Sequence, residues 1–171
     1  MPFETDYKKL LGKVDAVSIC TPTVTHFEIA KFFLDHHINT FVEKPITYTI
    51  DEAQILIDTA KKNNLKLQVG HVERFNSAFQ AVAPLAANPL FVECHRLNLF
   101  PNRSLDIGVV MDLMIHDIDI ILGMVQSTVK DIQAVGINVM TDKEDIANAR
   151  LTFQNGCVCN ITASRISPEV T

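Results

Sequence analysis

The sequence has no apolar run that approaches the ~18 residues of a membrane-spanning helix. Its first residues, MPFETDYKKLL, lack the apolar core of a signal peptide. Internal repeats, low-complexity segments and long linkers are absent as well. The 171 residues are 47% hydrophobic and 20% charged, which is typical of a soluble globular protein with one domain or two small ones. We therefore expect a cytoplasmic protein.

Positive charge is also scarce. The chain carries 15 Lys and Arg against 20 Asp and Glu, a formal net charge of −5. This balance argues against nucleic acid or an anionic membrane surface as the main partner.

Cysteine is too scattered to form a disulfide framework. Each of the four lies in an apolar run, and an intracellular chain keeps them reduced; they are Cys20, Cys94, Cys157 and Cys159. The last two are two residues apart, which places them on one face of a strand.

A β-hairpin is predicted around these two cysteines. If Phe153 opposes Cys157, the loop is Gln154-Asn155-Gly156, with Gly156 at the left-handed position that such loops favour. The cysteines then share a core-facing side with Ala147, Ala149, Leu151, Phe153, Ile161 and Ala163. No metal is needed to explain them, because free cysteine is often buried.

Strands and helices alternate in the first part of the chain. The pattern predicts strands at 14–19, 40–42 and 65–69 and helices at about 25–37 and 51–63, with Asp51 as an N-cap. Such alternation implies parallel crossovers in an α/β sheet.

The rhythm changes after residue 76. Helices are expected at about 76–87 and 106–125, with strands near 90–99, 130–140, 145–153 and 157–166. We therefore predict an α/β fold with two parts, a partial parallel-sheet domain over 1–72 and an α+β domain with a mostly antiparallel sheet over 73–171.

Three predicted strand ends carry unusual residues: CTPTVTH, EKP and GHVERFN. Parallel strands bring these loops to one edge, where open α/β sheets bind ligands. Taken alone, Cys20-Thr21-Pro22 can be a simple loop before a helix capped by Thr25. His26, in the first turn of that helix, could donate to a ligand or lie at the surface.

Lys44 ends the second predicted strand. Partial desolvation there favours the neutral amine, which suits proton transfer. Glu43 projects to the other side if the strand persists, and Pro45 restricts Lys44 to extended backbone angles. The alternative is a solvated strand end with no chemical task.

The segment SLDIGVVMDLMIHDIDIILGMV is apolar at nearly every position, so it predicts a helix buried on most sides. Asp112, His116 and Asp119 recur at i, i+4 and i+7 as one polar stripe. Buried groups of this kind must be hydrogen-bonded, paired or coordinated. Asp112 can orient His116, whereas a core network or a metal site are the alternatives.

Four segments, VDAVSICTPTVTH, VEKPIT, VGHVERFN and DLMIHDIDIIL, occur in the order found in the Gfo/Idh/MocA family of nicotinamide-dependent sugar oxidoreductases. The chain resembles that family over nearly its whole length. Within it, the segments VERFN, DLMIHDIDIIL and TDKEDIANARLTFQNGCVCNITASR look most like bacterial UDP-N-acetylglucosamine 3-dehydrogenases and related nucleotide-sugar enzymes.

The resemblance implies a Rossmann-type first domain, a substrate and oligomerisation domain after it, NAD or NADP as cofactor with NAD favoured, no metal, a nucleotide-sugar substrate and a homo-oligomer. It implies catalytic roles for Lys44, Asp112 and His116. Residues bordering the cofactor would be Cys20, Thr21, Pro22, His26, Glu43, Lys44 and Pro45. Substrate contacts would come from Lys44, Arg74, Asn76, Asp112 and His116.

One part of the family pattern is missing. The family starts with a strand, a G-x-G-x-x-G loop that holds the pyrophosphate, and a helix, but none of the six glycines here is so arranged. The segment ISPEVT also ends where the family's sheet continues. We therefore expect a chain truncated at both ends, an open edge at strand 14–19, weak or no NAD binding and little dehydrogenase activity from this chain alone. A non-catalytic scaffold of this fold, or a metal-dependent hydrolase using Asp112, His116 and Asp119, are the alternatives.

Overall fold

The computed structural model describes residues 3–86, 88–100 and 106–168. The chain forms two compact units, Met1–Gly70 and His71–Thr171. Within the described ranges, no helix has both the length and the apolarity that crossing a bilayer requires.

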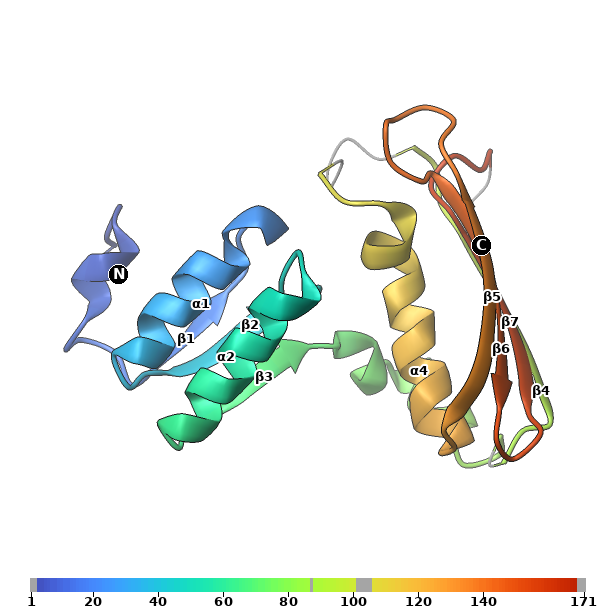
Figure 1. Cartoon of the computed structure of the whole chain (residues 1–171), viewed down its shortest axis with the longest axis horizontal. Helices are drawn as coiled ribbons and strands as arrows, with labels where there is room; N and C mark the ends of the chain where they lie inside the picture. Colours follow the sequence, from blue (N-terminus) through green and yellow to red (C-terminus); the bar gives the residue numbers. More distant parts are fainter. Residues whose placement is uncertain (1–2, 87, 101–105, 169–171) are drawn as a thin grey trace. The chain divides into compact units, whose positions relative to one another are not determined.

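The first unit is a three-stranded parallel sheet covered by two helices (Figure 1). Its strands lie in the order β1-β2-β3, and both α1 and α2 pack on one face. The elements are η1 (Tyr7–Leu10), β1 (Ala16–Ile19), η2 (Thr23–Thr25), α1 (His26–Asp35), β2 (Asn39–Glu43), α2 (Ile50–Lys62) and β3 (Leu67–Gly70). The predicted parallel α/β arrangement is confirmed.

The core of this unit comes from the alternation that the sequence predicts. Val42 on β2 has no exposed surface, and Ala30, Leu34 and Leu56 from the helices are likewise buried. One prediction is wrong: α2 is capped by Thr49, not by Asp51. The Thr49 hydroxyl accepts from the backbone N–H of Glu52, whose carboxylate accepts in return from the N–H of Thr49.

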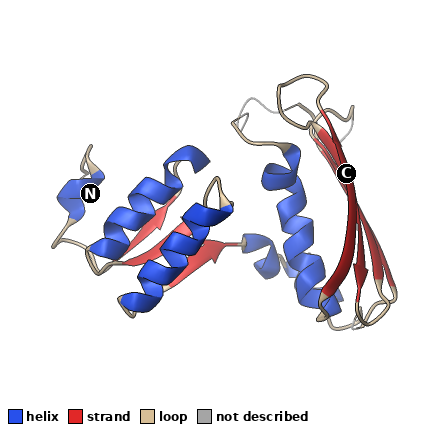
Figure 2. Cartoon of the chain, viewed as in Figure 1, coloured by secondary structure: helices blue, strands red, loops and turns tan. Residues whose placement is uncertain are grey.

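The second unit is a four-stranded mixed sheet with a long helix against one face (Figures 1 and 2). The strand order is β4-β7-β6-β5, with β4 parallel to β7 and the other pairs antiparallel. The elements are η3 (Val72–Phe75), α3 (Ser77–Val82), β4 (Phe91–Leu97), η4 (Val110–Met114), α4 (Ile115–Val125), β5 (Val129–Ile137), β6 (Ile146–Phe153) and β7 (Val158–Ser164).

The hairpin of β6 and β7 has the predicted register. The N–H of Phe153 donates to the Cys157 carbonyl at 2.9 Å, and Gly156 has φ +88°. Cys157 and Cys159 have no exposed surface and lie in the core. Burial, with the hydrogen bond between the Cys159 and Cys157 thiols, raises the pKa of Cys159 to about 12, so this thiol stays protonated at neutral pH.

The long helix differs from its prediction in two ways. Residues 110–114 form a π-helix, and regular α-helix starts only at Ile115. Its complete burial is also confined to one line, at Met114, Asp117, Ile121 and Val125, while most of its other positions are half-buried and Leu122 is 43% exposed. One helix against a four-stranded sheet buries one stripe of its surface.

Candidate functional site

In the first unit, the three strand ends lie along one edge of the sheet, as predicted. In the parallel register Ile19 pairs with Val42, and Glu43 pairs with Gly70. The segments Cys20–Pro22 and Lys44–Pro45 follow directly. Cys20, Thr21 and Pro22 are exposed, Lys44 is half-buried and Pro45 is buried. The Lys44–Pro45 peptide bond is cis.

His26 joins two of these loops. Its side chain is only 1% exposed, and its Nδ1 lies 2.8 Å from the Pro45 carbonyl oxygen. Its Nε2 lies 2.8 Å from the Thr21 carbonyl oxygen. A neutral ring donates to one of these carbonyls, and a doubly protonated ring donates to both. His26 is therefore buried and bridges the loops after β1 and β2 through its two ring nitrogens.

Thr25, predicted as a helix cap, makes no capping bond. Its hydroxyl lies 2.8 Å from the Pro22 carbonyl and 2.7 Å from the Thr21 hydroxyl. It therefore stabilises the loop after β1.

The position of the Glu43 side chain depends on Gly70, which was not among the predicted site residues. A Cβ on Gly70 would lie 3.0 Å from Glu43 Cδ and 2.9 Å from Phe41 Cζ. The Glu43 carboxylate therefore packs over a backbone that has no side chain. From there its Oε2 accepts the backbone N–H of Lys44 at 3.2 Å.

In the second unit, the predicted polar stripe exists, but its members have different surroundings. Asp112 lies in the π-helical turn and donates its N–H to the Gly108 carbonyl at 3.0 Å. His116 lies in the following α-helical turn. Both side chains are half-buried. π-Helical turns are rare and frequently occur at functional sites.

The third member of the stripe, Asp119, pairs with Arg74. Arg74 donates from Nε to Oδ2 at 2.6 Å and from Nη2 to Oδ1 at 2.5 Å. These bonds, with smaller contributions from His71 and His116, hold the pKa of Asp119 below its ordinary value. His71 Nδ1 lies 4.0 Å from Asp119 Oδ2. Within the described part of the chain no group of three potential ligands could hold a metal ion, so the metal-site alternative has no support.

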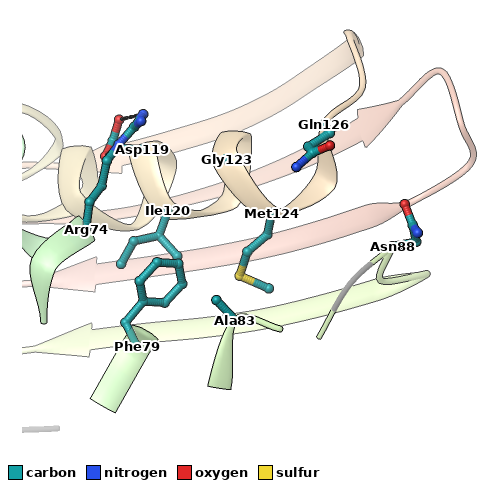
Figure 3. Close-up of a pocket in the computed structure, with 9 residues that line it drawn as sticks. All are labelled: Arg74, Phe79, Ala83, Asn88, Asp119, Ile120, Gly123, Met124 and Gln126. Atoms are coloured by element: carbon teal, nitrogen blue, oxygen red, sulfur yellow. Dashed lines mark hydrogen bonds and ion pairs between the residues drawn. The ribbon is translucent and has the colours of Figure 1, made fainter. Parts of the chain in front are cut away.

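The same ion pair bounds a pocket of about 350 Å³ between α3 and α4 (Figure 3). Phe79, Ile120 and Met124 form its apolar side. Asp112 and His116 do not line this pocket. Asn76, which stays a predicted substrate contact, caps α3 by accepting from the N–H of Ala78 at 3.0 Å.

Two further ion pairs, one half-buried and one fully buried, were missed by sequence reasoning. Arg96 on β4 binds both carboxylate oxygens of Asp117 on α4, at 2.7 to 3.1 Å. Arg165, after β7, donates from Nε to Asp145, before β6, at 2.8 Å, and neither side chain is exposed. Charged residues beside apolar strands were the available signal, but the partners are 21 and 20 positions apart and follow no local spacing rule.

Comparison with protein families identifies this arrangement. Residues 1–71 match the profile described as "Oxidoreductase family, NAD-binding Rossmann fold", and residues 66–170 match the GFO/IDH/MocA C-terminal domain. The chain belongs to the Gfo/Idh/MocA family. The predicted resemblance and the partial Rossmann-type fold are thereby confirmed.

Among Gfo/Idh/MocA proteins, UDP-N-acetylglucosamine 3-dehydrogenase of Acidithiobacillus ferrooxidans is 44% identical over 94% of this chain and 51% of its own length. A solved structure of that enzyme, GnnA, superposes with a TM-score of 0.90, covering 98% of this chain and 55% of that one. The oxidoreductase YrbE of Bacillus subtilis is 29% identical over 94% of this chain and 52% of its own length. The chain thus spans about half the length of the curated relatives it matches.

Proposed function

We propose that this chain belongs to an NAD(P)-dependent dehydrogenase that oxidises a secondary hydroxyl of a nucleotide sugar. NAD is the expected cofactor and UDP-N-acetylglucosamine the expected substrate. The observation that carries the proposal is the 44% identity to a UDP-N-acetylglucosamine 3-dehydrogenase over 94% of the chain. The ordered strand-end loops and the Asp112–His116 stripe support it.

The first unit offers part of a dinucleotide site. Open parallel sheets bind such ligands beyond their strand ends, where Thr21, Glu43 and Gly70 lie along one edge. Gly70 leaves room there because it has no Cβ. The sequence has no G-x-G-x-x-G loop, so we assign no residue to the pyrophosphate.

Oxidation of a secondary alcohol to a ketone removes a hydride from carbon and a proton from oxygen. NAD, when bound, supplies the hydride-accepting chemistry. We assign the handling of this proton to Lys44 and His116: the nitrogen that accepts it must be in its neutral form, since an ammonium or imidazolium has no lone pair, and the other side chain donates a hydrogen bond to the reacting oxygen. Asp112, four positions before His116, stabilises the protonated imidazole and orients the ring. We assign binding of the sugar before the reaction to the same three side chains, Lys44, Asp112 and His116.

The proposal is tested by NMR titration of the ¹⁵N-labelled chain with UDP-N-acetylglucosamine, with and without NADH. We expect saturable shifts of the amides of residues 110–116 with the nucleotide sugar, and little further change on addition of NADH, because this chain has no G-x-G-x-x-G loop. His116→Gln and Asp112→Asn should weaken this binding, whereas His95→Ala, on the exposed sheet face, should leave it unchanged. Titration with scyllo-inositol in place of the nucleotide sugar tests the substrate class. Absence of shifts at residues 110–116 with every ligand contradicts the proposal.

A further inference from the structure

The ion pair between Arg165 and Asp145 connects several segments of the second unit. Arg165 directly follows β7 and Asp145 directly precedes β6, and both have no exposed surface. Their backbones are joined as well, because the N–H of Arg165 donates to the Asp145 carbonyl at 3.0 Å. The pair therefore lies at one end of the β6–β7 pairing.

Asp145 organises the turn between β5 and β6. Its Oδ2 accepts the backbone N–H groups of Val139, Met140 and Thr141 at 2.7 to 2.9 Å. Burial alone would raise the pKa of Asp145, but these bonds and Arg165 outweigh it and hold the pKa well below its ordinary value. The carboxylate is thus ionised at neutral pH.

Arg165 reaches from this turn to the segment that leads into the long helix. Its Nη1 donates to the Ile107 carbonyl at 2.8 Å, and its Nη2 donates to the Thr141 hydroxyl at 2.9 Å. Ile107 itself is 3% exposed. One guanidinium therefore fixes three points, and this is possible because its donors form a rigid planar fork.

Glu144, the neighbour of Asp145, adds a second connection to the helix start. Its carbonyl accepts the N–H of Val109 at 2.9 Å, and its carboxylate lies 3.5 Å from the N–H of Val110. A Cβ on Gly108 would overlap that carboxylate. Consecutive residues 107–110 are thus held by the segment that Asp145 and Arg165 order.

We infer that Arg165 and Asp145 are positioning residues for Asp112 and His116, acting through the start of the helix that carries them. The π-helical turn 110–114 begins at the last of the anchored residues, Val110, and Asp112 donates its N–H to the Gly108 carbonyl. Farther along, Arg96 anchors the helix through Asp117. Because the π-helical turn is held on both sides, it cannot convert to α-helix by a shift of one residue. The catalytic meaning of this placement rests on the proposed function.

A purely stabilising role is a poor explanation for this pair. A fully buried ion pair loses much of its Coulomb energy to desolvation, and apolar residues of similar volume often serve stability equally well. Two surrounding strands are already apolar, with Ala147, Ala163 and Ile161 in the core. What apolar residues cannot supply is the set of directed bonds to Ile107, Thr141 and the 139–141 backbone.

The test compares three variants of the full chain. Arg165→Met removes every directed bond of the guanidinium. Arg165→Lys retains the positive charge beside Asp145, but its single nitrogen cannot also reach Thr141 and Ile107. Leu151→Ala, in the core on β6, is the matched control, because it destabilises the unit without removing any hydrogen bond to residues 107–110.

The first readout is amide hydrogen exchange by NMR. In both Arg165 variants we expect the amides of Val109, Val110 and Asp112 to exchange at least about tenfold faster relative to the β6 amides. Leu151→Ala should accelerate both groups together. Equal acceleration of both groups in Arg165→Met, or wild-type protection at the helix start in Arg165→Lys, would overturn the inference. Arg165→Lys decides the matter if Arg165→Met does not fold.

The second readout is the imidazole ¹H–¹⁵N spectrum, with His116 assigned from His116→Gln. We expect the His116 signals to shift in Arg165→Lys and not in Leu151→Ala, while His95 is unchanged in both. Unshifted His116 signals would contradict the inference. Neither readout needs substrate or cofactor. A chain that shows both changes yet binds no nucleotide sugar supports the positioning role and refutes the proposed function.

Discussion

The carboxylate of Glu43 lies over the α-carbon of Gly70, its partner in the parallel pairing of β2 and β3. The contact leaves no room for a methyl group, since Phe41 closes the other side of the same space. The conformation of the segment leading into Lys44 therefore depends on a glycine from a different strand.

Gly70→Ala should destabilise the first unit by about 1–3 kcal/mol, because the added methyl forces Glu43 and Phe41 to move. Gly123→Ala is the matched control: it lies in α4 with open space around it and should stabilise the chain by about 0.5–1 kcal/mol. Urea unfolding of both variants measures the difference. Equal free energies of unfolding for the two would show that the Gly70 contact is unimportant.

His26→Ala should loosen the loops after β1 and β2, because the ring that lies 2.8 Å from the Pro45 and Thr21 carbonyl oxygens is removed, and the loss of a buried hydrogen bond costs about 1–3 kcal/mol in total. We expect faster amide exchange at residues 46 and 47 and a lower free energy of unfolding. His37→Asn is the control, since His37 is exposed and Asn tolerates its φ of +60°. Unchanged exchange in His26→Ala would contradict the bridge between the loops.

Asp145→Asn should cost about 3–5 kcal/mol at neutral pH, because it leaves Arg165 buried without its counter-charge. The folded pKa of Asp145 is lowered, so its ionised form contributes stability fully above the unfolded pKa of about 3.9. That contribution is lost as pH falls through the folded value. The difference in free energy of unfolding between wild type and Asp145→Asn should therefore become smaller below about pH 4.

The measurement is the free energy of unfolding from neutral to acid pH, with Asp142→Asn, an exposed neighbour, as control. If the difference in free energy of unfolding between wild type and Asp145→Asn does not change with pH, the ionised carboxylate is not the source of the stability.

Arg74→Ala should change stability by no more than about 0–1 kcal/mol, because the Arg74 side chain is 55% exposed. Its effect should appear in the titration of Asp119, whose pKa rises toward the ordinary value when the two hydrogen bonds are removed. Carboxyl ¹³C shifts followed against pH measure this. An unchanged Asp119 titration would contradict the role given to Arg74.

The sequence predicts best where the signal is local. The β6–β7 register follows from apolar alternation and from Gly156, and the structure reproduces it. The capping box at Thr49 and Glu52 was also readable, since it has the usual three-residue spacing, but Asp51 satisfied a weaker version of the same rule.

The site was predictable only in part. The residue types at the strand ends and along the helix indicate chemistry, yet the partner of Asp119 is Arg74, 45 positions earlier. Pairings of this kind depend on tertiary structure, as does the closeness of Glu43 to Gly70. The π-helical turn follows from anchors on other elements, and no local pattern in residues 110–114 indicates it.

Strand β4 pairs with β7, so residues 91–97 find their partner only in residues 158–164. During synthesis β4 leaves the ribosome well before β7, so its backbone N–H and C=O groups bond to water until β7 is available. The first unit, in contrast, pairs strands that follow one another along the chain. Folding should accordingly be sequential, with the parallel sheet forming on the nascent chain and the mixed sheet closing only once β7 has emerged.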